Sequence, residues 1–220
     1  HGALLMLDNT WATPLFFKAF EHGVDISIHA ATKYLVGHSD AMLGVIVTTE
    51  PLYAGVRETV RQLGYIASAD DAYLGLRGLR TLGVRLRQHE SSALTVARWL
   101  QQRPEVAQVL HPALPGATGH AIFQRDFLGS TGLFGVVLKP APEPLINTFL
   151  ESLRLFAMGA SWGGFESLIR TQQRHPSAQI AAGVLLRLHV GLEAVEDLIA
   201  DLQQGLEHLS VTQPSSRSLP

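Results

Sequence analysis

The sequence has no cysteine in its 220 residues, which excludes disulfide bonds, thiolate metal ligands and a cysteine nucleophile. Long apolar runs are also missing, because the longest, 132–138 and 181–186, fall far short of the roughly 20 residues that a membrane-spanning helix needs. The formal net charge is only -2, so nothing indicates nucleic acid or an anionic membrane as a partner. No secretory signal is visible in the first residues, and we expect a soluble, cytoplasmic protein.

Several common site motifs are missing as well. The ten histidines are scattered, and although His29 and His38 lie on either side of Lys33, no His-Glu-x-x-His spacing occurs. There is no Gly-x-Gly-x-x-Gly or Walker loop either. We therefore expect no metal site, no dinucleotide site and no nucleoside-triphosphate site.

What the sequence does contain is an ordinary globular composition, with 46% hydrophobic and 16% charged residues. Residues 3–7 form an apolar run that ends in polar residues, which predicts a strand buried on both faces. A helix is expected from Pro14 to Gly23, followed by strands over 25–29 and 41–48. This alternation predicts an α/β fold with a parallel or mixed sheet.

The rest of the chain predicts a second, smaller layer. Leucines at helical spacing indicate one long helix over 70–103, and glycines within it indicate a bend. Beyond it we expect strands over 106–110, 132–138, 153–157 and 185–190, helices over 143–151 and 193–209, and a surface loop over 111–120. We expect one domain over 1–80, a smaller α/β (α+β) domain with the linking helix over 81–209, and a flexible tail over 210–220.

Lys33 is unusual among the three lysines, because in "AATKYLV" its neighbours are neutral and mostly apolar. Such surroundings disfavour the ammonium form, lower the pKa of a lysine and supply the neutral amine needed for a Schiff base or for proton abstraction. The alternative is a lysine whose stem packs while its head reaches water. On this short stretch alone, the alternative is the commoner case.

Other candidate residues have equally ordinary alternatives. Asp8, at the end of a predicted strand, could contact a ligand or cap a turn. Thr32 could donate its hydroxyl to a phosphate or satisfy a turn. The segment "GASWGGFESL", with Ser161 and Trp162, could approach a ligand closely or simply connect a strand to a helix. Arg187, in the apolar "LLRLHVGLE", could bind a substrate carboxylate or pair with a structural acid at a sheet edge.

Taken together, these segments resemble the Cys/Met-metabolism enzymes that use pyridoxal 5'-phosphate (PLP). The run "DISIHAATKYLVGHS", residues 25–39, resembles that family's cofactor-attachment signature along its whole length. The likeness continues in "LDNTWATP", "DAYLGLRGLRTLGVRLRQHE", "VLHPALPG", "SWGGFESL" and "RLHVGLE", and so covers nearly the whole chain. Within the family, the tryptophan of "SWGG" is more similar to bacterial cystathionine β-lyase than to the γ-enzymes.

The resemblance implies a fold-type I, aminotransferase-like α/β architecture with PLP as the cofactor. Lys33 would carry the cofactor as a Schiff base and would then abstract the substrate α-proton. Asp8 would pair with the pyridine nitrogen, and Thr32 would contact the phosphate. Many members have serine where this chain has Ala30, so one phosphate-binding hydroxyl would be absent.

The resemblance also implies the substrate and the reaction. Arg187 would bind the substrate α-carboxylate with help from Ser161, while Trp162 would shape the side-chain pocket. The reaction would be that of a carbon-sulfur lyase, which cleaves cystathionine by β-elimination to homocysteine, pyruvate and ammonia in methionine biosynthesis or transsulfuration. The alternatives within the family are cystathionine γ-synthase, cystathionine γ-lyase and methionine γ-lyase.

The likeness is to the C-terminal half of such enzymes. In full-length members, the preceding segment supplies a phosphate-binding glycine loop, a tyrosine stacked on the cofactor and groups given across a dimer interface. We therefore expect a full-length protein that is a homo-oligomer, a dimer or tetramer, and expect this part of it to bind PLP weakly or not at all and to be inactive alone. The alternative from another class is an inert structural or interaction module.

Overall fold

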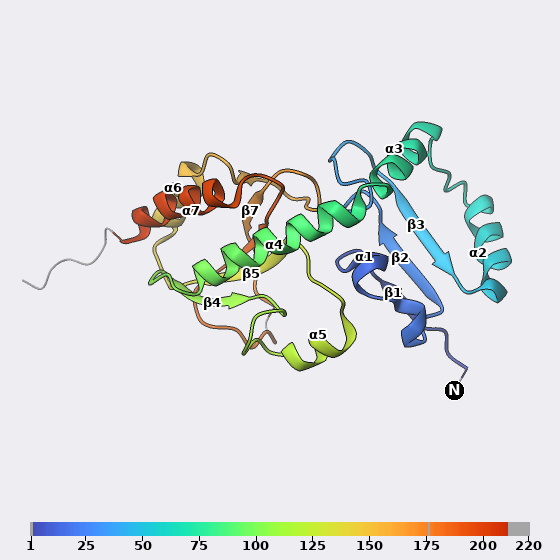
Figure 1. Cartoon of the computed structure of the whole chain (residues 1–220), viewed down its shortest axis with the longest axis horizontal. Helices are drawn as coiled ribbons and strands as arrows, with labels where there is room; N and C mark the ends of the chain where they lie inside the picture. The colour runs from blue at the N-terminus through green and yellow to red at the C-terminus, as the bar shows by residue number, and fades with distance from the viewer. Residues whose placement is uncertain (1, 176, 211–220) are drawn as a thin grey trace, which may run out of the picture.

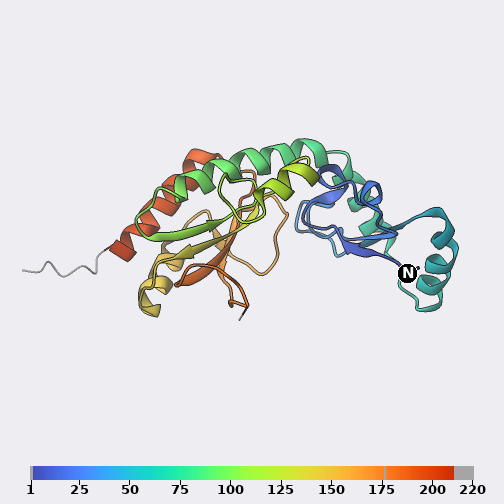
Figure 2. The same ribbon diagram turned by 90° about the horizontal axis from the view of Figure 1, so that it is seen from below.

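Two β-sheets lie at opposite ends of an elongated molecule, and one long helix runs past both of them (Figure 1, Figure 2). The structure is a computed structural model that describes residues 2–175 and 177–210. The first sheet has the order β1 (Met6–Asp8), β2 (Ile26–Ala30) and β3 (Gly44–Thr48). Strand β1 is parallel to β2 and β3 is antiparallel to it, so the predicted mixed sheet of an α/β fold is confirmed.

Strand β1 is not buried on both faces, and this prediction was wrong. The side chains of Leu4, Leu5 and Met6 are 61%, 51% and 59% exposed. The reason is position: β1 is an edge strand whose hydrogen-bonded neighbour is β2 alone. An apolar run shows that a strand can be buried, but the elements around it decide whether it is.

The segment between β1 and β2 forms two short helices where one was predicted. Helix α1 (Thr13–Phe16) has proline in its first turn, and a 3-10 helix (Ala19–His22) follows. The chain is extended at Phe17, whose ring packs against Phe127 at 4.9 Å between centroids. As predicted, Gly23 ends the segment, with a left-handed φ of 78° that glycine adopts at little cost.

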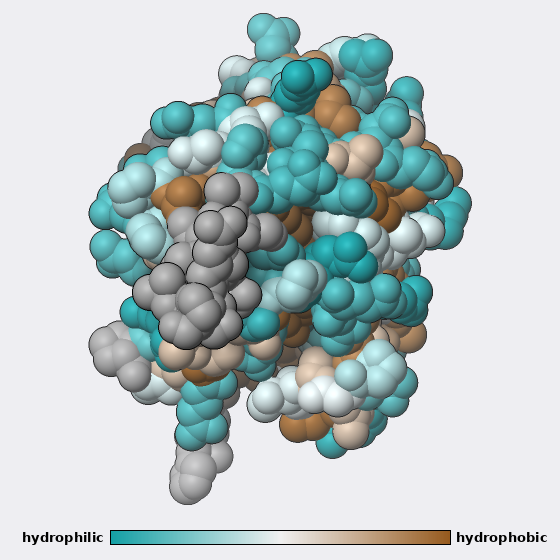
Figure 3. Space-filling model, turned by 90° about the vertical axis from the view of Figure 1, so that its left-hand side faces the viewer, coloured by the Kyte–Doolittle hydropathy of each residue, from teal (hydrophilic) through white to brown (hydrophobic). Residues whose placement is uncertain are grey.

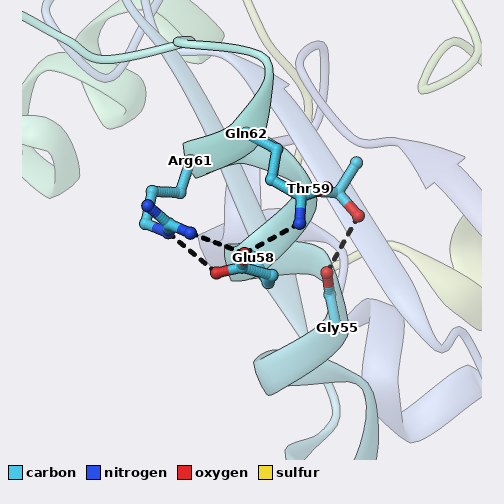
Figure 4. Close-up of polar contacts among 5 residues, drawn as sticks. All are labelled: Gly55, Glu58, Thr59, Arg61 and Gln62. Carbon is cyan, nitrogen blue, oxygen red and sulfur yellow. Dashed lines mark hydrogen bonds and ion pairs between the residues drawn. The ribbon is translucent and has the colours of Figure 1, made fainter.

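Helix α2 (Glu50–Gln62) was not predicted, and none of its residues is buried. Its side chains interact mainly along the helix surface, where Glu58 accepts hydrogen bonds from Arg61 and Gln62 (Figure 4). Thr59 also donates to the Gly55 carbonyl. Such exposed ion pairs stabilise a helix by less than about 1 kcal/mol. The opposite, half-buried side carries Leu52, Val56 and Val60 at helical spacing.

The predicted helix over 70–103 is two helices, α3 (Ala69–Leu79) and α4 (Leu82–Leu100). The bend that the glycines indicated is therefore a break, at Arg80 and Thr81. Gly78 lies so close to the Lys33 loop that a Cβ atom there would be 2.3 Å from the Leu35 carbonyl oxygen. Close packing at this point, rather than local propensity, sets the place where the helix turns.

The second sheet has five strands, and three of them lie where the sequence predicted. Its order is β4 (Val106–Leu110), β5 (Leu133–Leu138), β8 (Val184–His189), β7 (Leu168–Thr171) and β6 (Ala157–Met158). All neighbours are antiparallel except β6 and β7. The strand expected over 153–157 is only the two-residue β6, and β7 and α5 (His120–Asp126) were not predicted.

Helices α4, α6 (Glu143–Ser152) and α7 (Val195–Ser210) cover one face of this sheet and enclose the main core. Strand register places Phe134 and Ile169 beside Leu188 on that face. From the end where α6 and α7 lie, hydrophilic side chains cover most of the surface (Figure 3). Both helices were predicted. Ser210, the first residue of the tail expected over 210–220, is still part of α7. The rest of that tail, 211–220, lies outside the described residues.

Candidate active site

The backbone around Lys33 is held by a tight turn that follows β2. Lys33 N–H donates to the Ala30 carbonyl at 2.9 Å, and Gly37 N–H donates to the Lys33 carbonyl at 2.8 Å. The next side chain, Tyr34, is fully buried at 0% exposure. The main chain at Lys33 is therefore anchored, while its side chain is only half-buried and reaches outward.

The Lys33 amine contacts a residue far away in the sequence. Its Nζ donates a hydrogen bond to Ser161 Oγ at 2.7 Å and lies 5.3 Å from the centre of the Trp162 ring. No carboxylate pairs with it among the described residues. Burial, and then the nearby charge of Arg187, lowers the pKa of Lys33, so the neutral amine is more available than in an ordinary lysine.

Arg187 holds the segment that carries Ser161. Its Nη2 donates to the carbonyl oxygens of Gly159, Ala160 and Ser161 at 3.0, 3.0 and 2.9 Å. Strand β8 is an inner strand and no acid pairs with Arg187 in the described part of the chain, so the edge-strand ion pair considered above does not occur. Its Nε is buried without a hydrogen-bond partner in this structure.

Asp8 is connected to the Lys33 turn through one threonine. Its Oδ1 accepts hydrogen bonds from the backbone N–H and the hydroxyl of Thr10, at 2.9 and 2.5 Å. The Thr10 hydroxyl in turn accepts from Ala30 N–H at 2.8 Å, at the end of β2. Asp8 thus makes the turn contact that was its alternative, while its side chain stays exposed at the carboxyl end of β1.

Thr32 also makes the ordinary turn contact. Its hydroxyl accepts from Leu43 N–H at 2.9 Å and lies 3.3 Å from the Leu43 carbonyl oxygen, to which it donates. These bonds join the Lys33 turn to the start of β3. A phosphate contact by Thr32 stays a prediction, and it would compete with this pairing.

Three side chains behind Lys33, those of Tyr34, His89 and His189, were not singled out from the sequence. Tyr34 packs against Trp162, His89 and His189, with ring centroids 5.3 to 5.8 Å apart. Burial lowers the pKa of His189 to about 3 and also lowers the pKa of His89. Both rings are thus neutral at ordinary pH. The available signal was weak: His189 is a polar residue inside the apolar strand "LLRLHV".

Other kinds of site find no support in the described residues. No group of three or more His, Asp or Glu side chains lies close enough there to hold a metal ion. Within the same part of the chain, no helix is long and apolar enough to cross a membrane. The convergence of Lys33, Ser161, Trp162 and Arg187 is the arrangement that calls for a chemical explanation.

Comparison with known proteins supplies a context for this arrangement. The model of the family described as Cys/Met metabolism PLP-dependent enzyme matches residues 1–207. The sequence is 52% identical over 216 residues to cystathionine beta-lyase MetC of Escherichia coli (strain K12), covering 94% of this chain and 54% of that protein. It is 50% identical over 215 residues to cystathionine beta-lyase of Salmonella typhimurium, with the same coverage of 94% and 54%.

A solved structure agrees with these sequences. The crystal structure of cystathionine gamma synthase from Xanthomonas oryzae pv. oryzae, in complex with aminoacrylate and cysteine, superposes with a TM-score of 0.87 at 35% identity. The match covers 96% of this chain and 57% of that one. The chain spans about half the length of the curated relatives it matches, 54% for the two named above.

Proposed function

The chain belongs to the Cys/Met metabolism PLP-dependent enzyme family, and we propose that its Lys33 site serves a carbon-sulfur lyase. The proposed reaction is β-elimination of cystathionine to homocysteine, pyruvate and ammonia. The observation that carries the proposal is the hydrogen bond of 2.7 Å from Lys33 Nζ to Ser161 Oγ, with Arg187 bonded to the carbonyl of the same serine. The similarity to cystathionine beta-lyases supports this choice among the reactions of the family.

The residues present fit the reactive end of PLP. A lysine amine with a lowered pKa and no carboxylate partner in the described chain is suited to react with an aldehyde. The exposed carboxylate of Asp8 is suited to a protonated pyridine nitrogen, and Thr32 supplies one hydroxyl for the phosphate. When bound, PLP supplies an electron sink for chemistry at the substrate α-carbon.

The chain's own groups would then bind the substrate and move a proton. Lys33, as the free amine, would take the α-proton and hold it as an ammonium. Ser161 Oγ, already an acceptor for Nζ, would orient that ammonium. The guanidinium of Arg187 would bind the substrate carboxylate, which would provide the partner that its buried Nε lacks.

Two further parts of the proposal concern substrate choice and assembly. Trp162 lies beside Lys33 Nζ and would form one wall of the side-chain pocket. A γ-synthase or γ-lyase reaction is the alternative, favoured by the structural similarity to cystathionine gamma synthase.

We also propose that the full-length protein is a homo-oligomer. We propose further that the 220-residue chain alone binds PLP weakly, because the Thr32 hydroxyl, which would contact the phosphate, is already engaged by Leu43.

The first test asks whether Lys33 is the reactive amine. The purified chain is mixed with excess PLP, reduced with borohydride and mapped by peptide mass spectrometry. We expect modification at Lys33 well above that at Lys18 and Lys139, because burial lowers the pKa of Lys33 and so makes its neutral amine more available. Lys33→Arg removes the selective label and Lys139→Arg is the matched control; equal labelling of all three lysines would contradict the proposal.

The second test asks which reaction the site supports. In a chimera, the aligned 216 residues of the Escherichia coli relative are replaced by those of this chain. We expect pyruvate from cystathionine, and a loss of at least about 100-fold in kcat on Lys33→Arg, as is typical when a positioned general base is removed. Formation of 2-oxobutyrate would favour the γ alternative, and a cofactor-loaded chimera that forms neither product would overturn the lyase proposal.

A further inference from the structure

Every second residue from Arg187 to Glu193 contacts the segment 159–167, which carries Ser161 and Trp162. The contacts of Arg187 are described above, and those of His189, Gly191 and Glu193 continue the series along the chain. Within β8, the period of two places Arg187 and His189 on one side of the strand. Beyond the strand, Gly191 contacts the segment through its backbone N–H and Glu193 through its carboxylate. We call residues 159–167 the site loop.

His189 contacts the middle of the site loop. Its Nε2 lies 3.2 Å from Gly163 N and 3.1 Å from the Gly164 carbonyl oxygen. A neutral imidazole can accept from the first with one tautomer or donate to the second with the other, so a bond to the loop is available in either case. The side chain is fully buried, at 0% exposure, and so has no competing water.

Glu193 holds the far end of the site loop. Its two carboxylate oxygens accept from the Ser167 N–H and hydroxyl, at 2.7 and 2.8 Å. The Ser167 hydroxyl also accepts from Gly191 N–H at 2.8 Å. Hydrogen bonds to a carboxylate are stronger than neutral ones, so this end is firmly attached to the chain beyond β8.

The site loop leaves no space between itself and the Lys33 turn. Gly163 has φ of 85°, and a Cβ atom there would lie 3.0 Å from Lys33 Cα. A Cβ atom at Gly164 would lie 2.2 Å from Ser39 Oγ. A shift of the loop away from His189 therefore changes the position of Ser161 and Trp162 relative to the Lys33 amine.

We propose that His189 and Glu193 are positioning residues, which hold the site loop so that Ser161 Oγ and the Trp162 ring stay against the Lys33 side chain. Their meaning for catalysis rests on the proposed function, but the positioning itself does not. Neither residue contacts the Lys33 amine. Their effect on it passes through the backbone of the site loop.

His89 provides the matched control for a purely structural role. It is also a histidine at 0% exposure, its ring lies 5.2 Å from that of His189, and its Nδ1 bonds to the Val190 carbonyl. It makes no hydrogen bond to the site loop in the described structure. His89→Leu therefore disturbs the same core without removing a contact to residues 159–167.

The test measures the site loop and the Lys33 amine directly, in the purified chain. Hydrogen exchange of peptides over 159–167 is compared for the native chain, His189→Leu, His189→Gln, Glu193→Gln and His89→Leu. We expect exchange about tenfold faster in His189→Leu, as for the loss of one buried hydrogen bond, with partial recovery in His189→Gln and an intermediate effect in Glu193→Gln. In His89→Leu the site loop should exchange as in the native chain.

The second readout is the titration of Lys33 after reductive 13C-methylation, with Lys18 and Lys139 as internal references. We expect the pKa of Lys33 to rise toward its ordinary value in His189→Leu and to stay lowered in His89→Leu. Equal effects of the His89 and His189 substitutions would overturn the proposal, as would an unchanged site loop in a folded His189→Leu chain. Because neither readout needs PLP or turnover, failure of the proposed function would appear separately, in the borohydride labelling.

Discussion

Lys33 owes its chemistry to what surrounds its amine. Its backbone is fixed by the turn after β2, its Nζ has a serine hydroxyl as partner, and the nearest charge that affects its pKa is the positive Arg187. Burial and, after it, the positive charge of Arg187 favour the neutral amine, which is the reactive form. The single residue thus has the properties expected of a Schiff-base lysine, although its partners come from distant segments.

Buried histidines make stability depend on pH, and His189 is the clearest case. Burial lowers its pKa from 6.5 to about 3. Between these values the unfolded chain binds a proton that the folded chain does not, so the free energy of unfolding falls as the pH falls below 6.5. We expect this residue alone to account for a loss of about 3 kcal/mol between pH 7 and pH 4.

Urea unfolding at several pH values tests this expectation. The His189→Gln chain should lose stability less steeply than the native chain on acidification, because glutamine does not titrate. The pKa of His111 is lowered in the same direction, to about 4, so part of the slope should remain. Identical slopes for the two chains would show that His189 is not the group responsible.

At the scale of elements, the site loop depends on one glycine that packs against the Lys33 turn. Gly163→Ala adds a Cβ atom 3.0 Å from Lys33 Cα and 2.9 Å from Tyr34 N, in addition to the strain of a φ of 85°. Gly116 is the matched control, since its φ is 82° but a Cβ atom there would meet nothing within 4 Å. The difference between the two substitutions isolates the contact from the strain.

We expect Gly116→Ala to lower the free energy of unfolding by about 1 kcal/mol, the usual cost of a left-handed alanine. Gly163→Ala should cost about 3 kcal/mol and should also reduce borohydride labelling of Lys33. Denaturant unfolding and the labelling assay measure the two effects. Equal costs at the two positions would mean that the site loop and the Lys33 turn are not in the tight contact described.

The elements themselves differ in how far the sequence predicts them. Strands β4, β5 and β8 lie where their runs of apolar, largely branched residues predicted them. Of these, β5 and β8 are inner strands, whereas β4 is an edge strand and is less buried. Helix α2 was missed although Leu52, Val56 and Val60 recur four residues apart, a helical spacing, and form its half-buried side. The break between α3 and α4 depends on the close approach of Gly78 to another segment, which local periodicity cannot show.

At the scale of the whole molecule, α4 connects the two sheets, and Arg85 attaches it to the Lys33 turn. The Arg85 guanidinium donates to the carbonyls of Tyr34, Leu35 and Gly78 at 2.8, 3.3 and 2.8 Å, and its side chain is 6% exposed. Burial lowers its pKa, and no acid pairs with it among the described residues. We propose that 1–80 and 81–209 are separate domains and that Arg85 couples their unfolding.

Arg85→Gln should therefore lower stability by about 3 kcal/mol, because it leaves buried carbonyls without donors. We expect the native chain to unfold in one transition and the Arg85→Gln chain to unfold in two, one for each domain. Arg87→Gln, an exposed change on the same helix, should stay within about 0.5 kcal/mol of the native chain. The unfolding of Arg85→Gln is followed by fluorescence and by far-ultraviolet circular dichroism. A single transition with the same midpoint by both signals would contradict the domain proposal.

The sequence by itself determined the family and the α/β class, and it named Lys33 as the candidate lysine. These are properties of short segments: "DISIHAATKYLVGHS" resembles the family signature by its own residues, and an apolar run predicts a strand from its own residues. The candidates Lys33, Ser161, Trp162 and Arg187 were all predicted from such segments. Asp8 and Thr32 were named in the same way, and the structure adds that both are engaged in turns.

Only the tertiary structure decided which of these residues meet and what holds them. Lys33 and Ser161 are 128 positions apart, and their contact depends on Arg187, His189 and Glu193 holding the site loop against the turn. The exposure of β1 was decided in the same way, by the absence of a second neighbouring strand in the described sheet. The physical reason is common to both: hydropathy and spacing act along the chain, whereas contact and burial depend on how distant segments pack.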